Sequence, residues 1–327
     1  MNIFLDYRWS GTHGLGRMTE EIFLHNSPSL LKFRLSPSSP FDPFILSLYL
    51  FFKLSKNDIF LTFGYSAPFF SRNPYYITIA DLNYIDCIEN TSFFKRLYFN
   101  VIVKRLVIKA EKVLTISEFS RLRIIEWSGL SPESVVNVGC GVSQVFFDNK
   151  YVWEPGYEYI LVSGNRKLHK NESVALRAFS NLQINKKIKL VFTGSANVTL
   201  ISLAKELNIS DRVIFLGVVS TTTLSSVYRG AICLLFPSLY EGFGLPAAEA
   251  MASGTPVITS CLTSLPEVVA DSAILINPYS VNEITFALEH VISDESLRQS
   301  LISSGLIRSR SFSWSLVAKK VNNAITN

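Results

Sequence analysis

A segment that runs from an apolar strand through a loop into a helix carries two glutamates eight positions apart, one in the loop and one in the first turns of the helix. The segment 236–251 reads FPSLYEGFGLPAAEAM, in which an apolar run ends at Phe236 and helix-forming residues follow Pro246. Glycines let this loop approach a ligand closely, and the N–H groups of residues 243–245 at the positive helix end would face hydroxyl or phosphate oxygens. Glu241 and Glu249 could therefore point at one ligand. Either glutamate alone would more often be a surface residue or an acid favoured by the helix dipole, but the whole stretch favours a binding site.

A second strand–loop–helix segment carries positive charge. Residues 161–172 read LVSGNRKLHKNE, and the loop contains Arg166, Lys167 and Lys170. A diphosphate requires fixed positive charge, which Arg supplies as a planar fork and Lys as a mobile point charge. A solvated basic loop is the alternative, and His169 alone is more often a hydrogen-bonded loop residue than a catalyst. Beside the two glutamates, the segment predicts a phosphate-binding loop.

The third segment is a glycine turn after the first strand. Gly11, Gly14 and Gly16 form the pattern G-x-x-G-x-G, which differs from the dinucleotide pattern G-x-G-x-x-G but could still cradle a phosphate through backbone N–H groups. The sequence contains no D-x-D pair, no Cys/His cluster with metal-ligand spacing and no P-loop. We therefore expect no metal and no cofactor, and no NTPase.

These loops need strands that end at one edge of a sheet. Short apolar runs predict strands at 2–7, 58–62, 76–79, 112–116 and 135–138, and again at 159–163, 189–193, 213–216, 231–236, 256–259 and 273–276. Helical spacing lies between them, at 18–24, 93–110, 172–181, 197–207, 222–229, 246–253 and 282–292. This alternation predicts an α/β protein with doubly wound parallel sheets, in which ligands bind beyond the carboxyl ends of the strands.

The length and composition of the chain limit the class of protein and the number of domains. The chain has 327 residues, 48% hydrophobic and 17% charged, which excludes a disordered protein and favours two domains. The pattern breaks near 151–156, so we predict domains at 1–152 and 153–310, followed by a last helix at 311–327. Four cysteines without close spacing predict buried, reduced thiols. The first residues lack a signal-peptide pattern and the run 44–52 is too short to span a bilayer, which predicts a cytoplasmic protein.

Together these residues resemble the retaining glycosyltransferases that have the GT-B fold and an E-x7-E motif. Glu241 and Glu249 stand at that spacing within YEGFGLPAAEAMASGTPVI. The resemblance continues through SLPEV at 264–268, and it takes in the basic loop, AEKVLTISEFS at 110–120 and the glycine turn. It covers nearly the whole chain, with residues 25–75 matching least. It implies two Rossmann-like domains that face each other across a cleft, with the last helix crossing back to the first domain.

The resemblance also implies a role for each matching residue. Glu241 would hold hydroxyls of the transferred sugar, and Glu249 would bind the ribose of the nucleotide. Arg166 and Lys170 would neutralise the leaving diphosphate, although in related sequences the Arg precedes the Lys by one more residue. The other implied donor contacts are the backbone at Phe243, Gly244 and Leu245, the base-facing turn at Val219, and Gly14, Gly16 and Asp81 from the first domain.

One position departs from this family. Its members commonly carry His-Asp where this chain has Ala80 and Asp81, and that His contacts the donor sugar. A water, another side chain such as His13, or a different donor would have to compensate, or the protein would be inactive. Because the donor-binding half keeps its motifs, we expect an active enzyme.

The family implies a metal-independent transferase that moves a hexose from a nucleotide-diphosphate sugar and keeps the anomeric configuration. Residues 165–171, NRKLHKN, resemble bacterial mannosyltransferases of surface-polysaccharide (O-antigen or capsule) assembly, so GDP-mannose is the first expected donor, before rhamnosyl or glucosyl donors. The first domain would bind a glycan or polyprenyl-diphosphate-linked acceptor. The alternative is a non-catalytic sugar-nucleotide-binding partner of another transferase. An NAD-dependent oxidoreductase is disfavoured because its glycine fingerprint is absent.

The basic excess, 31 Lys and Arg against 26 Asp and Glu, has two sources. The charges of the basic loop suit a diphosphate, so we expect no nucleic-acid partner. Helix 93–110 carries Lys95, Arg96, Lys104, Arg105 and Lys109, which favour peripheral contact with an anionic inner membrane face, a solvated surface being the alternative. The aromatic stretch 41–52 is expected to be a buried core helix, a lip that touches lipid being the alternative.

Overall fold

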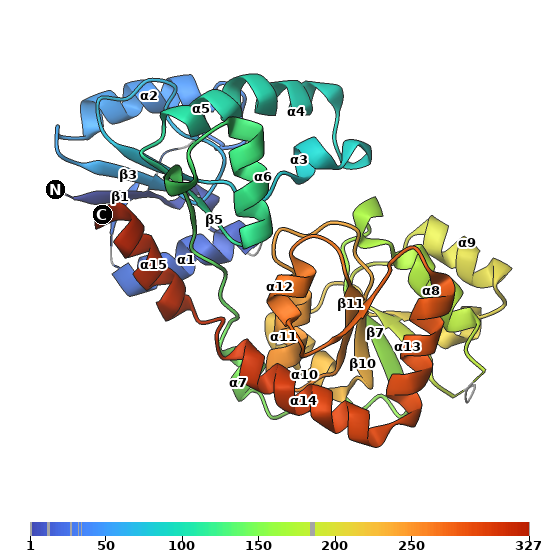
Figure 1. Ribbon diagram of the computed structural model, residues 1–327. Coiled ribbons are helices and arrows are strands. Elements are labelled where there is room, and N and C mark those ends of the chain that lie inside the picture. Colours follow the sequence, from blue (N-terminus) through green and yellow to red (C-terminus); the bar gives the residue numbers. More distant parts are fainter. Residues whose placement is uncertain are drawn as a thin grey trace. The chain divides into compact units, whose positions relative to one another are not determined.

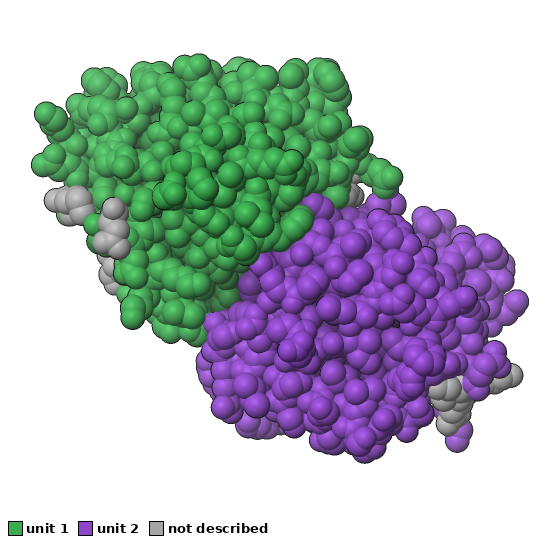
Figure 2. Space-filling model, in the orientation of Figure 1, with its two compact units in different colours: residues 1–141, 313–327 green, residues 142–312 purple. Residues whose placement is uncertain are grey.

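The computed structural model describes residues 2–11, 14–26, 28–31, 33, 35–183 and 187–326. The chain divides into two compact units, residues 1–141 with 313–327 (unit 1) and residues 142–312 (unit 2), which Figure 2 colours separately. Within the described residues, each unit contains one six-stranded parallel sheet. The predicted α/β architecture with two parallel sheets is confirmed.

The sheet of unit 1 has the strand order β2-β1-β3-β4-β5-β6. Its strands are β1 (Ile3–Asp6), β2 (Ser29–Leu31), β3 (Ile59–Thr62), β4 (Tyr75–Thr78), β5 (Lys112–Thr115) and β6 (Val135–Asn137). The helices around it are α1 (Gly14–Asn26), α2 (Asp42–Lys53), α3 (Asn83–Asp86), α4 (Phe93–Tyr98), α5 (Lys104–Lys109), α6 (Glu118–Ser128) and α15 (Trp314–Thr326) (Figure 1). Strands β3 and β4 are buried along their whole length, as expected for a parallel sheet with helices on both faces.

The last helix packs within unit 1. Helix α15 contacts α1 and β5, and the Tyr76 hydroxyl donates to the carbonyl oxygen of Ile325 at 3.2 Å. Where the helix begins, the Trp314 ring lies so close to Gly141 that a Cβ there would come within 2.4 Å of a ring carbon. Glycine at 141 therefore lets the returning chain approach the end of the first segment closely.

The sheet of unit 2 has the strand order β12-β11-β10-β7-β8-β9. Its strands are β7 (Tyr159–Val162), β8 (Lys189–Phe192), β9 (Val213–Phe215), β10 (Cys233–Phe236), β11 (Val257–Ser260) and β12 (Ile274–Ile276). Its helices are α7 (Val145–Asp148), α8 (Glu172–Ser180), α9 (Val198–Glu206), α10 (Thr221–Gly230), α11 (Leu245–Ala252), α12 (Leu265–Val269), α13 (Val281–Ser293) and α14 (Glu295–Ser309). Strands β7 and β10 are direct neighbours, so the loops that follow them start side by side.

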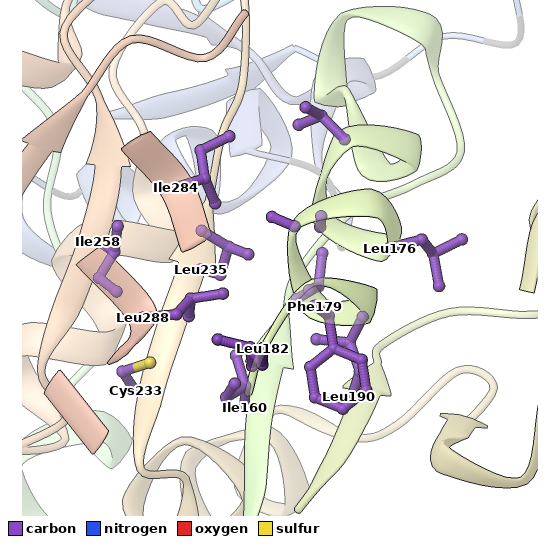
Figure 3. Packing of buried hydrophobic residues seen from close by; sticks show 14 of the residues in the cluster. Ile160, Leu176, Phe179, Leu182, Leu190, Cys233, Leu235, Ile258, Ile284 and Leu288 are labelled. Carbon is purple, nitrogen blue, oxygen red and sulfur yellow. The ribbon is translucent and has the colours of Figure 1, made fainter. Parts of the chain in front are cut away.

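An apolar cluster holds this sheet to its helices. Ile160 of β7 and Leu235 of β10 lie in one cluster with Phe179 of α8 and Leu288 of α13 (Figure 3). All four side chains are fully buried, and burial of such a side chain stabilises a fold by about 1.5–3 kcal/mol. This packing therefore fixes strands β7 and β10, whose carboxyl ends carry the candidate site.

The division between the units lies at residues 141 and 142, earlier than the predicted boundary at 152, and the second crossing lies at 312 and 313 instead of 310. The segment before 152 packs on unit 2. Phe146 of α7 is fully buried beside the Tyr228 ring, and the side-chain amide of Asn149 donates to Ser226 Oγ at 2.9 Å. The break in pattern near 151–156 marks an extended segment of unit 2, which a sequence pattern cannot distinguish from a linker.

Most predicted elements are present, and the differences are local. Helix α1 begins at Gly14, whereas the sequence pattern placed its start at Met18, so Gly14 and Gly16 belong to its first turns. The short elements β2 and α12 and the polar helix α14 were not predicted. They give weak signals because β2 has three residues and α14 lacks a clear apolar stripe.

Two expectations about burial are wrong in part. Among the cysteines, Cys140 and Cys233 are buried, but Cys87 is half-buried and Cys261, which follows the end of β11, is exposed. The stretch 41–52 forms helix α2, but only one of its faces packs on the core, through residues such as Leu46 and Leu50. The opposite, apolar face is exposed. Among the described residues, no helix is both long and apolar enough to cross a membrane.

Candidate active site

The loop after β10 holds the carboxylate of Glu241 at the carboxyl edge of the unit 2 sheet. One oxygen of this carboxylate accepts hydrogen bonds from Ser238 Oγ at 2.6 Å and from Lys170 Nζ at 2.5 Å. The Glu241 N–H donates to Thr263 Oγ1 at 3.1 Å, and the Glu241 carbonyl oxygen accepts from Ser264 Oγ at 2.9 Å. Loops from three adjacent strands, β7, β10 and β11, thus fix one acidic side chain.

Lys170 and Glu241, predicted from separate segments, form an ion pair. Their side chains are only 11% and 12% exposed. Lys170 ends a 3-10 helix, Leu168–Lys170, that follows β7, and Glu241 follows the adjacent β10. The carboxylate has lone pairs left for hydroxyl donors, and the ammonium group has N–H bonds left for anionic oxygens. The pair can therefore hold a sugar and an anion at neighbouring positions.

Arg166 is occupied by the protein itself. Its backbone has a left-handed φ of 64°, and its guanidinium donates to the carbonyl oxygens of Ser195 at 2.7 Å and Thr193 at 2.6 Å. It also forms a salt bridge with Glu172 and donates to the Gly194 carbonyl oxygen. These acceptors use most of the five N–H donors of an arginine. Arg166 thus joins the loops after β7 and β8, and its predicted contact with a diphosphate stays a prediction.

Replacing Arg166 with alanine is expected to lower the free energy of unfolding by about 3–5 kcal/mol, because Glu172 would keep a buried charge without its partner. Burial already raises the pKa of the Glu172 carboxyl, and Arg166 opposes that rise. Urea unfolding measures the loss. Arg177→Ala, on the exposed side of α8, is the matched control and should change stability by less than about 0.5 kcal/mol. If Arg166→Ala unfolded at the same urea concentration as the wild type but lost turnover, we would conclude that Arg166 contacts the substrate.

Glu249 lies deeper than Glu241, in helix α11. Its side chain is buried, and one carboxylate oxygen is 3.5 Å from the hydroxyl of Tyr228. That hydroxyl is also 3.4 Å from Oγ of Ser163, the residue after β7. The structure thus places Glu249 beside the same strand end that leads to Lys170. Its predicted contact with a ribose stays a prediction.

The loop that leads into helix α11 can offer backbone N–H groups to a ligand. Gly244 takes a left-handed φ of 98° as N-cap, and a Cβ there would come within 2.5 Å of Leu265. The Phe243 side chain is buried against Phe312, with ring centroids 5.3 Å apart, so this residue can offer only its backbone to a ligand. Pro246 has no N–H, and the N–H groups of Ala247 and Ala248 donate to the Gly244 carbonyl oxygen at 3.0 and 3.3 Å, so the backbone N–H groups suited to a ligand are those that come before Pro246. This arrangement suits the predicted backbone contacts with a sugar and a phosphate.

Val219 lies at the far end of the same sheet edge. It follows β9 and is half-buried, two residues after Gly217. The N–H of Gly194 donates to the Gly217 carbonyl oxygen at 2.8 Å, which ties the loops after β8 and β9 together. This hydrogen bond holds the turn that leads to Val219. The predicted contact of Val219 with the nucleotide base stays a prediction.

His169 precedes Lys170 in the same 3-10 helix and was not assigned a role from the sequence. It is 9% exposed, and its carbonyl oxygen accepts from the N–H of Leu239 at 2.7 Å and from Ser238 Oγ at 3.1 Å. Burial, reinforced by the charge of Lys170, lowers the pKa of His169 to about 4. The imidazole is therefore neutral at physiological pH, and the residue joins the two loops through its backbone carbonyl oxygen.

The neutral imidazole predicts a pH effect on stability. An ordinary histidine has a pKa of 6.5, so unfolding makes His169 bind a proton between about pH 6.5 and 4. The resulting stabilisation is fully present above about pH 6.5 and is lost as the pH falls through 4. We expect His169→Gln to flatten the fall in melting temperature over this window, while His25→Gln, on the exposed end of α1, leaves it unchanged. Equal slopes for wild type and His169→Gln would contradict this expectation.

The remaining predicted residues belong to unit 1 and follow its strand ends. A Cβ at Gly16 would come within 2.3 Å of the Gly11 carbonyl oxygen, so the glycine turn packs tightly on the start of α1. A carboxylate oxygen of Asp81 accepts from the N–H of Asn83 at 2.9 Å. Ala80 offers its carbonyl oxygen to Thr115 Oγ1 at 3.3 Å. His13, the suggested substitute for the missing histidine, lies outside the described residues. The donor contacts of Gly14, Gly16 and Asp81 stay predictions.

Four residues that shape the site were missed by the sequence reasoning: Ser238, Glu172, Thr263 and Ser264. Three of them are hydroxyl side chains that hold Glu241. A signal was available, because the segment 260–264, SCLTS, follows a strand adjacent to β10 in the sheet. In the described part of the chain, no three His, Cys, Asp or Glu side chains gather as a metal site would require. The metal-free reaction stays a prediction.

Comparison with known proteins identifies the family. The family described as "Glycosyl transferases group 1" matches residues 144–307, half of the chain. The chain belongs to this family. The matched region lies within unit 2 and includes Lys170, Glu241 and Glu249. The glycosyltransferase predicted from the sequence is thereby confirmed at the level of the family.

Relatives of this glycosyltransferase include O-antigen chain mannosyltransferase B of Escherichia coli, 28% identical over 264 residues, which are 76% of this chain and 68% of that one. The serotype-specific mannosyltransferase WbdA of Escherichia coli is 28% identical over 243 residues, 69% of this chain but only 29% of that longer protein. The solved structure of Anabaena Alr3699/HepE in complex with UDP and glucose has a TM-score of 0.78 at 17% identity and covers 99% of this chain and 98% of that one. This likeness confirms the GT-B fold.

Proposed function

We propose that this glycosyltransferase transfers a hexose, first of all mannose from GDP-mannose, to a glycan or lipid-linked acceptor in bacterial surface-polysaccharide synthesis. The observation that carries the proposal is the buried Lys170–Glu241 pair beside the start of α11. The names of the two Escherichia coli relatives support mannose, and the segment NRKLHKN agrees with them. Rhamnosyl and glucosyl donors are the next candidates. The enzyme would act in the cytoplasm.

The reaction proposed is a displacement with retention. The acceptor hydroxyl attacks the anomeric carbon from the face that the diphosphate leaves, and a phosphate oxygen takes the hydroxyl proton. The bond between the anomeric carbon and the phosphate oxygen breaks as the new glycosidic bond forms. The Lys170 ammonium stabilises the charge that develops on the diphosphate, and the N–H groups at the start of α11 assist it. Glu241 holds sugar hydroxyls near the reacting carbon, and no step of this scheme needs a metal.

Titration calorimetry with a panel of GDP-, UDP- and dTDP-sugars tests the donor. We expect GDP-mannose to bind most tightly, and the ribose contact of Glu249 predicts that Glu249→Gln weakens every member of the panel alike. Preference for a dTDP- or UDP-sugar would replace mannose with another hexose. If no sugar nucleotide binds, the proposal fails.

A second function is favoured by one observation, the alanine at position 80, where the resemblance to the family leads us to expect a histidine. The protein would then bind a sugar nucleotide as a non-catalytic partner of another transferase. Nucleotide release in the presence of a lipid-linked acceptor separates the two functions. Binding without release supports the partner, and release that disappears in Glu241→Gln supports the enzyme.

A further inference from the structure

Unit 1 carries an apolar surface that the proposed reaction does not use. It consists of the outward faces of α2 and of the continuous helix 93–109, in which a π-helical turn, Phe99–Val103, joins α4 to α5 (Figure 1). On α2, this surface includes Phe41, Ile45, Leu48 and Phe52, which follow one another at helical spacing and are all exposed. We call the two outward faces together the basic aromatic face.

Helix α2 is unusual for a helix that meets water. No charged residue lies between Asp42 and Lys53, and Phe52 is 84% exposed. A helix that is apolar on all sides is normally buried in a core or a membrane. Exposed apolar patches of this kind mark sites of interaction. The outward face of α2 therefore requires a partner outside this chain's core.

Helix 93–109 adds positive charge to the same surface. It exposes Phe94 at 79% and also Leu97, Val101 and Ile108, and it contains five Lys or Arg residues and no acidic residue. The two helices are linked through Phe69, whose ring centroid is 4.5 Å from the ring of Phe44 and 4.6 Å from the guanidinium of Arg105. Apolar and cationic side chains thus share one continuous surface.

A hollow opens beside this surface, and its lining also combines aromatic and basic side chains. Its volume is about 500 Å³, and Phe69 and Phe70 line it together with Arg72 and Lys109. The two cations outnumber the single carboxylate in its lining, that of Glu111. A phosphate-bearing headgroup would meet positive charge here while aromatic rings lie alongside it.

We propose that the basic aromatic face docks on an anionic lipid bilayer, with α2 and helix 93–109 lying in the plane of the interface. Aromatic and aliphatic side chains enter the boundary between headgroups and acyl chains, and Lys and Arg side chains pair with anionic headgroups. A second copy of this chain is a poorer occupant, because a symmetric contact through this face would set cations against cations. Under the proposed function, the same bilayer would present a lipid-linked acceptor, but the docking itself does not depend on that function.

Flotation of the full chain with lipid vesicles tests the proposal. We expect binding to vesicles of phosphatidylcholine with phosphatidylglycerol, weak binding to phosphatidylcholine alone, and loss of binding as salt increases. The double variant Phe52→Ser with Phe94→Ser should bind about tenfold more weakly, since both rings leave the interface. The matched control is Phe286→Ser with Ile307→Ser, exposed residues of unit 2 that should have no effect. Melting curves establish that all variants are folded.

Three results would overturn the docking proposal. They are no binding of the wild type to anionic vesicles, equal loss in the control pair, or a concentration-dependent dimer that the Phe52 and Phe94 changes abolish. Sugar-nucleotide titration without lipid is run in parallel. Because that titration involves unit 2 and no vesicles, failure of the proposed function and failure of docking give different patterns.

Discussion

Replacing Glu241 with glutamine is expected to lower kcat about 100- to 1000-fold, a loss typical of removing one preorganised electrostatic contact. Glutamine keeps the size of the side chain, and its carbonyl oxygen can still accept the hydrogen bond from Ser238. The amide cannot balance the charge of Lys170, and it holds the sugar hydroxyls less strongly than a carboxylate does. The rate of GDP release with acceptor present measures the effect.

The matched control for this variant is Glu206→Gln. Glu206 is exposed at the end of α9, and its neutralisation should leave the rate unchanged. Melting temperatures of both variants show whether folding is affected. A Glu241→Gln enzyme that kept more than about a tenth of the wild-type rate would exclude the proposed contact between Glu241 and the reacting sugar.

The sheets and the two residues of the ion pair could be predicted because they follow from short patterns, whereas the contact between the two residues was not predicted. Buried parallel strands give apolar runs that end at turn residues, and each such run marks where a loop starts. Lys170 and Glu241 each follow such a run closely, at 159–162 and 233–236. Once two strands are neighbours, their loops must meet at one edge, so proximity of the two charges followed from topology alone.

The hydrogen-bond partners of Arg166 could not be predicted in the same way. A basic residue in a loop looks equally suited to a ligand and to protein carbonyl groups. Its acceptors at residues 193–195 come from the next strand's loop, and their direction depends on backbone angles that no local pattern specifies. The same holds for Thr263, whose φ of 58° turns a loop toward the Glu241 N–H.

The burial of α2 was overestimated for a related reason. An uncharged aromatic helix has the composition of a core element, so its sequence predicts burial on all sides. Whether a second layer covers it depends on the rest of the fold. In unit 1, residues such as Leu46 reach the core while Phe52 does not. The mismatch between composition and exposure is itself informative, because it is what indicates an external partner.

Replacing Lys170 with methionine is expected to lower kcat about 100- to 1000-fold, because the ammonium group would no longer stabilise the leaving diphosphate. Methionine keeps the length of the apolar stem, so packing near the Phe236 ring, 5.1 Å from the ammonium nitrogen, is largely preserved. Lys167→Met is the matched control, since Lys167 is exposed in the same loop and should cost little. Rates of GDP release at saturating GDP-mannose measure both effects. Equal losses in the two variants would show that the loop needs positive charge in general and that Lys170 has no specific contact.

A double variant decides whether Lys170 acts on the diphosphate or only through Glu241. If its sole task were to orient Glu241, then Lys170→Met would add nothing once Glu241→Gln has removed the charge that it pairs with. If it also stabilises the diphosphate, the double variant should lose a further factor of about ten or more relative to Glu241→Gln alone. We expect the further loss, because the two groups approach different parts of one donor. A double variant no slower than Glu241→Gln would make Lys170 a positioning residue and would leave the N–H groups of α11 as the principal stabilisers of the leaving group.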